Sequence, residues 1–402
     1  MSTAAQTSQE MLARARELRP ALLERQEETE RLTHYPETTH RELLDAGFYR
    51  LLTPRRYGGH EMALDDYLKV MIEIARGCPS TGWSLCLPIG HTLLVASLYP
   101  LEVQDELLGE YFFAASFGAP VGEAVRADGG WELTGTWPYS SGIAWSTHFM
   151  GQTAVPGEEL PMLFVAPRSS WTKVDDWGDS LGLKGSASNS VRFDGGFVPE
   201  RFCIHDLVMV DIDVDEPTPG YLLHGNPMYA GRSLGLFMCE LAAIAVGAGK
   251  AVLDEYERII RSRTTTWGPE QLRYQHSDPQ RHLGLGMGQI LMAEAAVLGM
   301  AREWMELCRR GMEDGVPYGP LDDHRIAVVT TQAARQVYAA AQDLFQMAGS
   351  TASRDGRRMQ RLIRDLGTYW SHNTPSQYEL LAQTLAMLQL GFPKEQLPAT
   401  GA

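Results

Sequence analysis

Hydrophobic residues follow two different spacings along the chain and divide it into three blocks. From residue 8 to about residue 111 they recur three and four positions apart, which is typical of amphipathic helices. Between residues 112 and 213, turn signals recur every several residues and aromatic and β-branched residues cluster in short runs, which indicates short antiparallel strands. Beyond a connector rich in proline and aspartate at 211–220, the helical spacing returns in long segments. These segments are residues 234–263, 279–312, 324–347 and 380–390.

The order of helices, a compact sheet and a helical bundle predicts three domains. Their expected boundaries are 1–111, 112–213 and 221–402. Because the sheet interrupts two helical blocks, we expect the outer blocks to pack together and the sheet to cover a cleft at their junction. A cleft of this kind suits a planar ligand.

The composition indicates a folded protein that avoids anionic partners. Of the 402 residues 44% are hydrophobic, which excludes a disordered or fibrous chain. Fifty acidic residues stand against 35 basic ones, and the resulting formal charge of −15 repels phosphate backbones and anionic bilayers. We therefore expect no nucleic-acid and no membrane partner. The most apolar stretch, residues 234–253, is interrupted by Glu240 and Lys250 and is interpreted as a buried helix.

The cysteine and histidine spacings indicate a reducing compartment and no metal site. No two of the five cysteines are two positions apart, so neither a disulfide framework nor a zinc knuckle fits. The eleven histidines form none of the common metal-ligand spacings. The polar start, residues 1–10, lacks the apolar run of a secretory signal. We therefore expect a cytoplasmic protein.

Several short motifs resemble, in sequence order, those of the acyl-CoA dehydrogenase family. The resemblance implies an α+β, mainly α fold with a helical N-terminal domain, a middle β-barrel and a C-terminal four-helix bundle. This agrees with the three blocks deduced from the hydrophobic pattern. The motifs lie at residues 44–48, 53–59, 134–142, 181–190, 197–200, 261–263, 346–349 and 361–365.

One position departs from the dehydrogenases of that family. Their common form uses a glutamate as the base that removes a proton from an acyl thioester, and Asn373 stands at the matching position here. An asparagine side chain does not accept a proton at neutral pH. Some dehydrogenases carry the glutamate on another helix, and Glu240 lies close to that position. An acyl-CoA dehydrogenase or oxidase with tightly bound FAD therefore stays the second hypothesis, and a catalytically inactive helical scaffold the third.

The neighbouring residue, His372, leads to a different branch of the same fold. The chain resembles the oxygenase components of two-component monooxygenases, such as the 4-hydroxyphenylacetate and steroid-phenol hydroxylases. The resemblance rests on Trp83 and His91 in a Trp-x₇-His motif, on Ser116, on the Ser-Ser-Gly turn at 140–142 and on His372.

Membership of this branch implies a reduced flavin, FMN or FAD, that a separate reductase supplies. Oxygen would be the co-substrate, a C4a-hydroperoxide the reactive form, and a phenolic or fused heteroaromatic small molecule the compound that is hydroxylated. The resemblance also implies a homotetramer built as a dimer of dimers. The sequence leaves the choice between FMN and FAD open.

Three residues are the catalytic candidates that this resemblance implies. His91 and His372 would take a phenol proton, and Ser141 would accept a hydrogen bond from flavin N5. Each has a structural alternative. Either imidazole is equally suited to a core position where a backbone carbonyl satisfies it, and Ser140, Ser141 and Gly142 can form an ordinary hairpin turn.

The remaining candidates divide between cofactor and substrate. Tryptophan rings suit the walls of a planar site, although they also fill cores, and arginine suits a flavin phosphate contributed to a neighbouring subunit. Trp83, His91 and Ser116 are the expected substrate-binding residues. The expected cofactor-binding residues are Trp137, Ser140, Ser141, Gly142, Trp177, Arg263 and Gln346.

Overall fold

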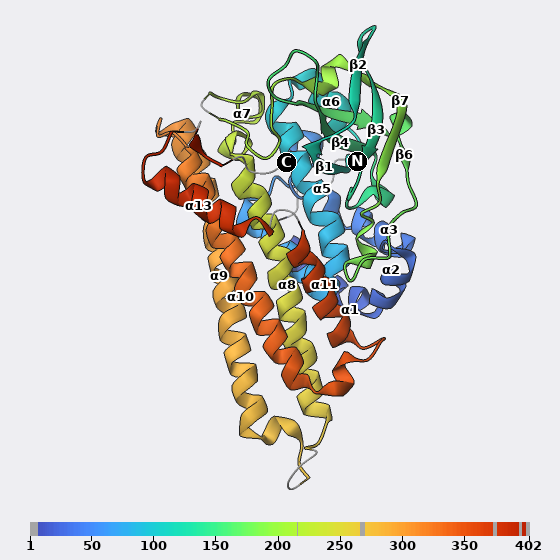
Figure 1. The fold of residues 1–402 in the computed structure, drawn as a ribbon, viewed down its shortest axis with the longest axis vertical. Helices are drawn as coiled ribbons and strands as arrows, with labels where there is room; N and C mark the ends of the chain where they lie inside the picture. The colour runs from blue at the N-terminus through green and yellow to red at the C-terminus, as the bar shows by residue number, and fades with distance from the viewer. Residues whose placement is uncertain (1–6, 215, 266–269, 373–375, 394–395, 399–402) are drawn as a thin grey trace.

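A computed structural model shows two helical blocks that pack against each other, with two small sheets beside them that come between the blocks in sequence (Figure 1). It describes residues 7–214, 216–265, 270–372, 376–393 and 396–398, so Asn373 lies outside the described residues. The order of blocks confirms the expected fold class. One hydrophobic core runs through all three blocks, and the exact domain boundaries therefore stay a prediction.

The first helical block is built around a helix without charges. α5 lies between Cys78 and Tyr99, begins with a proline at its first position and is buried along almost its whole length. The amphipathic helix α4 covers it with one face. The helices of this block are α1 (Ser8–Glu24), α2 (Gln26–Leu32), α3 (Glu37–Asp45), α4 (Leu64–Gly77), α5 (Pro79–Leu98) and α6 (Leu101–Leu108).

The middle block consists of two four-stranded sheets in the orders β1-β4-β5-β8 and β2-β3-β7-β6. The predicted middle β-barrel is present as two sheets that do not close, because edge strands β6 and β8 have two residues each and no described strand joins the sheets. One pair, β1 with β4, is parallel, whereas we expected only antiparallel strands. The strands are β1 (Ala114–Pro120), β2 (Glu123–Ala127), β3 (Gly130–Trp137), β4 (His148–Thr153), β5 (Met162–Pro167), β6 (Thr172–Lys173), β7 (Val191–Pro199) and β8 (Cys203–Ile204).

The C-terminal block is a bundle whose helix α8 packs on α5 and α4 as well as on its own neighbours (Figure 1). The first half of α8 is buried on all sides and the second half is amphipathic. The predicted helical segments agree with the helices to within a few residues. The helices are α7 (Pro219–His224), α8 (Ser233–Ser262), α9 (Ser277–Glu313), α10 (Pro320–Ala348), α11 (Arg358–Ser371) and α13 (Tyr378–Gln389).

Three helices of the described chain have the length and apolar composition of a membrane span. Two of them, α5 and α8, have 89% of the relevant window buried inside the protein. These two are core helices, as expected for the apolar stretch at 234–253. In the third, α9, only 22% of the window is buried.

An ion cluster joins the bundle to the segment that follows the sheets. Arg232, which is 1% exposed, lies 3.1 Å from Asp211 and 2.5 Å from Asp213, and its Nε lies 3.5 Å from Asp323. Asp323 also accepts hydrogen bonds from Tyr318 and from the backbone N–H of Gly235. The cluster thus connects the start of α8, the start of α10 and the preceding loop.

We predict that Arg232→Met lowers the free energy of unfolding by about 3–5 kcal/mol, because the buried Asp323 carboxylate then lacks its countercharge. Denaturant unfolding of both proteins measures the difference. Arg261→Met is the matched control, since Arg261 forms an exposed pair with Glu257. The control is expected to change stability by less than about 1 kcal/mol. Equal losses in both variants would contradict a special role of the cluster.

Candidate active site

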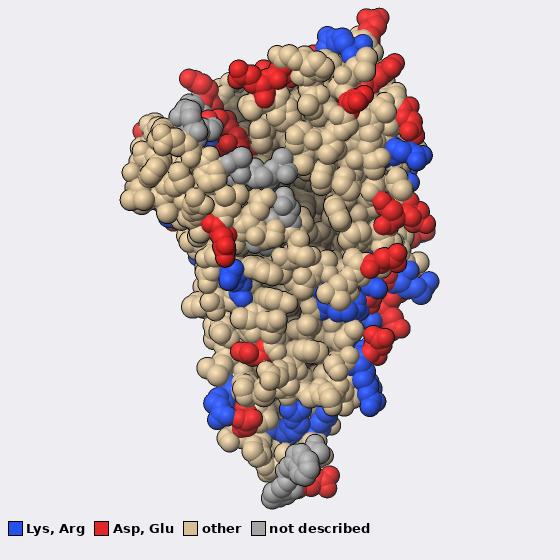
Figure 2. Space-filling model, in the orientation of Figure 1, with Lys and Arg blue, Asp and Glu red and all other residues tan. Residues whose placement is uncertain are grey.

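A cavity of about 720 Å³ lies where the sheets meet the two helical blocks. Side chains of α5, β1 and α8 form one part of its lining, and side chains of α10, α11 and α13 form another. Figure 2 shows this face of the molecule hollowed in its upper half. The predicted cleft therefore exists at the predicted junction.

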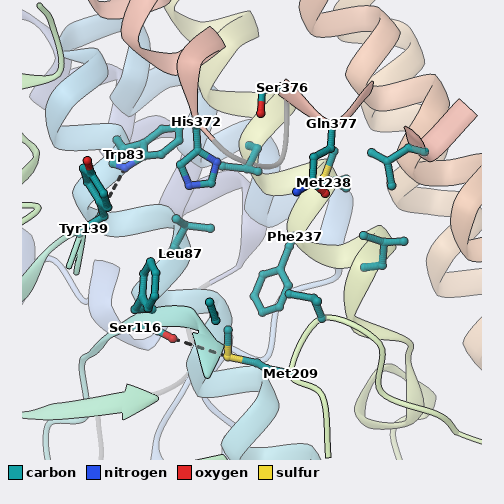
Figure 3. A pocket seen from close by; sticks show the side chains of 18 of the residues that line it. Trp83, Leu87, Ser116, Tyr139, Met209, Phe237, Met238, His372, Ser376 and Gln377 are labelled. Carbon is teal, nitrogen blue, oxygen red and sulfur yellow. Dashed lines mark hydrogen bonds between the residues drawn. The ribbon is translucent and has the colours of Figure 1, made fainter. Parts of the chain in front are cut away.

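Four side chains form a hydrogen-bonded chain along one wall of the cavity. Trp83 Nε1 donates to Ser141 Oγ at 2.8 Å, drawn as a dashed line from Trp83 in Figure 3. Ser141 Oγ lies 2.8 Å from Ser188 Oγ, which lies 2.7 Å from Ser186 Oγ. All four residues line the cavity. Because Trp83 occupies one lone pair of Ser141, the tryptophan holds this hydroxyl in place.

The turn that carries Ser141 contacts α5 where one backbone hydrogen bond of this continuous helix is missing. Pro88 inside α5 has no N–H, so the carbonyl of Ser84, four residues earlier, lacks its usual helical donor. Gly142 has a φ of +83°, and a Cβ atom there would come within 2.5 Å of the Ser84 oxygen. Glycine therefore allows both the left-handed turn and its close contact with the helix.

Helix α11 holds the loop that carries Ser186 and Ser188. Asp365 Oδ1 accepts the backbone N–H of Leu183 at 2.7 Å, and Thr368 Oγ1 accepts that of Gly182 at 2.7 Å. Burial raises the pKa of Asp365 to about 7. The sequence motif at 361–365 thus positions the motif at 181–190. Sequence reasoning did not identify Ser186 and Ser188 as cavity residues, although both belong to this second motif.

Aromatic rings form the mouth of the cavity on the sheet side. Tyr139, which has a φ of +52°, and Trp177 both line the cavity, and their rings contact edge to face at 6.3 Å. The indole N–H of Trp177 has no hydrogen-bond partner among the described residues. Sequence reasoning missed Tyr139, although it directly precedes the predicted Ser-Ser-Gly turn.

Three of the predicted cofactor contacts do not line the cavity. Trp137 is fully buried between the sheets, where its ring packs against phenylalanines such as Phe193 and its N–H donates to the Gln152 carbonyl. Ser140 does not line the cavity and donates to the Trp137 carbonyl. The N–H of Gly142 donates to the Ser186 carbonyl and is not available to a ligand. Successive side chains of a strand point to opposite faces of the sheet, and Trp137 of β3 stands on the face that meets the core.

His91 lies in the middle of α5 and lines the cavity opposite Phe237 of α8. Its Nδ1 donates to the carbonyl of Ala114 at 2.7 Å, since a carbonyl only accepts, and Nε2 of the neutral ring is then an acceptor. Burial lowers the pKa of His91 to about 4. The ring is therefore neutral at physiological pH.

His372 follows α11 directly and points into the cavity beside Trp83 (Figure 3). The two rings meet edge to face with centroids 5.1 Å apart. Burial lowers the pKa of His372 to about 4, so this ring is also neutral at physiological pH. The structure brings His91, His372, Ser141 and Trp83 to one cavity, as predicted.

Ser116 of β1 lines the same cavity from below in Figure 3. Its hydroxyl lies 3.5 Å from the sulfur of Met209, a residue that the sequence did not single out. Phe237 and Met238 of α8 approach from the other side. This part of the lining is apolar apart from the hydroxyl and suits an aromatic ligand.

Arg263 and Gln346 do not line this cavity. Arg263 follows the last residue of α8, and Gln346 is an exposed residue in the last turn of α10. Both lie at the end of their long helix that is farther along the bundle from the sheets (Figure 1). Neither residue therefore belongs to the cavity that the other candidates share.

Two models of one family match the sequence. They are the N-terminal domain of acyl-CoA dehydrogenase over residues 6–101 and its C-terminal domain over residues 239–377, together more than half of the chain. The chain belongs to the acyl-CoA dehydrogenase family. This confirms the resemblance deduced from the ordered motifs.

Relatives within the family are hydroxylases. The pigment production hydroxylase of Rhodococcus sp. is 29% identical over 373 residues, which cover 91% of this chain and 92% of that protein. The oxygenase component of p-hydroxyphenylacetate 3-hydroxylase from Acinetobacter baumannii is 23% identical over 390 residues, or 95% and 89% of the two chains. The structure of XiaF from Streptomyces sp. in complex with FADH2 and glycerol superposes with a TM-score of 0.85, at 23% identity, over 97% of both chains. The predicted class, a flavin-dependent monooxygenase of this fold, is thus confirmed.

Glu240 does not provide the base that a dehydrogenase of the family needs. Its carboxyl group points at Gly90, where an added Cβ would lie 2.3 Å from Oε1, and Glu240 is not part of the cavity lining. Burial raises the pKa of Glu240 well above its ordinary value, so the group is a neutral acid in the core. Its neighbours Met238 and Leu241 face the cavity instead.

The pKa of His91 predicts a loss of stability in acid. The folded ring binds a proton only near pH 4, whereas the unfolded chain binds one near pH 6.5, so unfolding takes up a proton between these values. Stability therefore falls as the pH falls from about 6.5 to 4, by up to roughly 3 kcal/mol for this group. Unfolding curves of the parent and of His91→Phe between pH 7 and pH 4.5 test it. The variant is expected to lose less stability over this range; identical slopes would contradict a neutral, buried His91.

Proposed function

We propose that the chain is the oxygenase component of a two-component monooxygenase and hydroxylates a phenolic or fused aromatic small molecule. A separate reductase supplies the reduced flavin, FMN or FAD. The proposal rests on one observation: two neutral imidazoles, His91 and His372, share a cavity with the fixed hydroxyl of Ser141. Two relatives, the pigment production hydroxylase and the oxygenase component of p-hydroxyphenylacetate 3-hydroxylase, support the same reaction type, because both are hydroxylases.

The residues present fit a planar flavin ring on the sheet side of the cavity. The Trp177 N–H is a buried donor without a partner among the described residues, and Tyr139 offers an exposed aromatic face beside it. Ser141 and Ser188 provide hydroxyl groups along the same wall. Such a set suits a ring system that carries both donors and acceptors along its edges.

When bound, the reduced flavin supplies two electrons and activates molecular oxygen for transfer to an aromatic carbon. The protein contributes binding, orientation and proton control. Ser141, held by Trp83, is the acceptor for an N–H at the flavin edge, and the neutral rings of His372 and His91 accept a phenol proton. A more electron-rich phenol ring attacks an oxygen electrophile faster, so this proton acceptance assists the reaction.

The function is tested with purified protein, free reduced flavin, isotope-labelled oxygen and a phenol. The chain alone is expected to oxidise no NAD(P)H, and addition of reduced flavin is expected to give a hydroxylated product that carries the label. In His372→Ala the hydroxylation rate is expected to fall by about 10²–10⁴-fold, as general acid–base groups usually contribute.

His34→Ala is the control. Like His91, His34 bonds a backbone carbonyl through Nδ1, but it lies outside the cavity lining. Its rate is expected to stay near that of the parent. A His372→Ala rate within about threefold of the parent would refute the proton-acceptor role. A yellow protein that an acyl thioester bleaches would instead favour the dehydrogenase or oxidase alternative.

Arg263 and Gln346 are assigned to the flavin of a neighbouring subunit, and the proposed assembly is a homotetramer in the cytoplasm. Helix α9 supports an assembly, since one of its faces is apolar and exposed. Gly284 and Gly288, four residues apart on α9, leave room for a close helix contact. The exposed apolar side chains of α9 are Leu285, Met287, Leu291 and Met292.

Leu291→Glu is expected to dissociate the assembly, because a charge is then buried in an apolar interface. Light scattering after gel filtration is expected to give the mass of four chains for the parent and a smaller mass for the variant. Val125→Glu on β2 is the control, since Val125 is also exposed, at 61% against 51% for Leu291, but lies away from α9. A monomeric parent would contradict the proposed assembly.

A further inference from the structure

The cavity contains no described cation. Among its described lining residues there is neither lysine nor arginine, and the one carboxylate, Asp211, is paired with Arg232 outside the lining. Most of the other side chains are apolar or carry neutral hydroxyl groups. A carboxylate ligand would lose its hydration here without gaining a countercharge, whereas an uncharged aromatic molecule would not.

His324 lines this cavity and played no part in the site described above. It lies in the first turn of α10, where its Nδ1 is 2.9 Å from the carbonyl oxygen of Pro320. Since a carbonyl only accepts, Nδ1 carries the proton of this bond, and Nε2 is the ring nitrogen that can accept a hydrogen bond.

Nε2 of His324 is buried and has no hydrogen-bond partner among the described residues, and the whole residue is only 7% exposed. A buried acceptor without a donor costs free energy, which a ligand recovers if it brings a donor. Most buried polar groups are satisfied within a protein, and because His324 lines the cavity, a ligand bound there can supply the missing donor.

His324 lies near the start of α10 and so contributes to the cavity lining from the bundle. Helix α8 lies between α5, which carries His91, and α10, which carries His324 (Figure 1). The α8 residues Phe237 and Met238 also line the cavity (Figure 3). Helix α13 packs on α10, and its Thr384, another lining residue, donates its only hydroxyl proton to the Leu380 carbonyl, so it too presents lone pairs.

We infer that His324 is a specificity-determining residue that accepts a hydrogen bond from a hydroxyl or N–H group at the far end of an uncharged aromatic substrate. The cavity correspondingly selects against aryl carboxylates. This inference rests on the proposed function, because it assigns the substrate class of the same site. It requires a substrate with two polar ends, one that is hydroxylated near His91 and His372 and one that binds His324.

Calorimetric titration of the full chain without flavin tests the inference with three matched probes. These are a naphthalenediol with hydroxyls on opposite ring ends, its monomethyl ether and the corresponding hydroxynaphthoate. The parent is expected to bind the diol about three- to tenfold more tightly than the ether, as a single hydrogen bond contributes. The hydroxynaphthoate is expected to bind at least about tenfold more weakly than the diol, because its charge is not compensated.

In His324→Leu the preference for the diol over the ether is expected to vanish, and in His324→Gln, which keeps an acceptor oxygen, it is expected to return in part. His34→Leu is the control and is expected to keep the parent's preference. A preference that survives in His324→Leu, or a hydroxynaphthoate that binds as tightly as the diol, would overturn the inference.

The two proposals fail in different ways. A chain that binds the diol through His324 but transfers no labelled oxygen supports the inference and refutes the monooxygenase function for such compounds. A chain that hydroxylates phenols, but whose preference for the diol over the ether is unchanged in His324→Leu, supports the monooxygenase function and refutes the inference.

Discussion

The hydrogen bond from Trp83 to Ser141 connects the helical and sheet parts of this protein at the cavity wall. It forms because a turn of the sheet region approaches α5 closely. The helical hydrogen bond that Pro88 cannot donate leaves the Ser84 carbonyl open to this turn, and the missing side chain of Gly142 leaves room for the contact. Ser188 and Ser186 extend the chain of hydroxyls into a loop that α11 holds through Asp365. Three parts of the sequence thus meet at one hydroxyl group, the one that the proposed function assigns to the flavin edge.

Burial, and not charge, sets the chemistry of the cavity. The protein is strongly acidic overall, yet most side chains that line its cavity are apolar, hydroxyl-bearing or, as in His91 and His372, neutral imidazoles. Burial lowers the pKa of both imidazoles and so keeps them uncharged. In the proposed function this leaves each ring with a nitrogen that can accept a proton or a hydrogen bond.

The orientation of α8 decides which of its side chains reach the cavity. Phe237, Met238 and Leu241 face the cavity, whereas Glu240 points at Gly90 and stays a neutral acid in the core. One helix therefore offers the ligand aromatic and aliphatic contacts but no base. The rotation of a helix about its axis decides which residues take part, because neighbouring side chains are about 100° apart.

The sequence alone determined the order of helices and sheets, the cleft between them and the family, because hydrophobic spacing and ordered motifs are local properties of the chain. It also singled out Trp83, His91, Ser116, Ser141, Trp177 and His372, all of which line the cavity. Only the tertiary structure decided that Trp137 faces the core, that Tyr139, Ser186, Ser188 and His324 face the cavity, and that Glu240 does not. Those outcomes depend on which face of a strand or helix meets its neighbour, and packing between distant segments sets that choice.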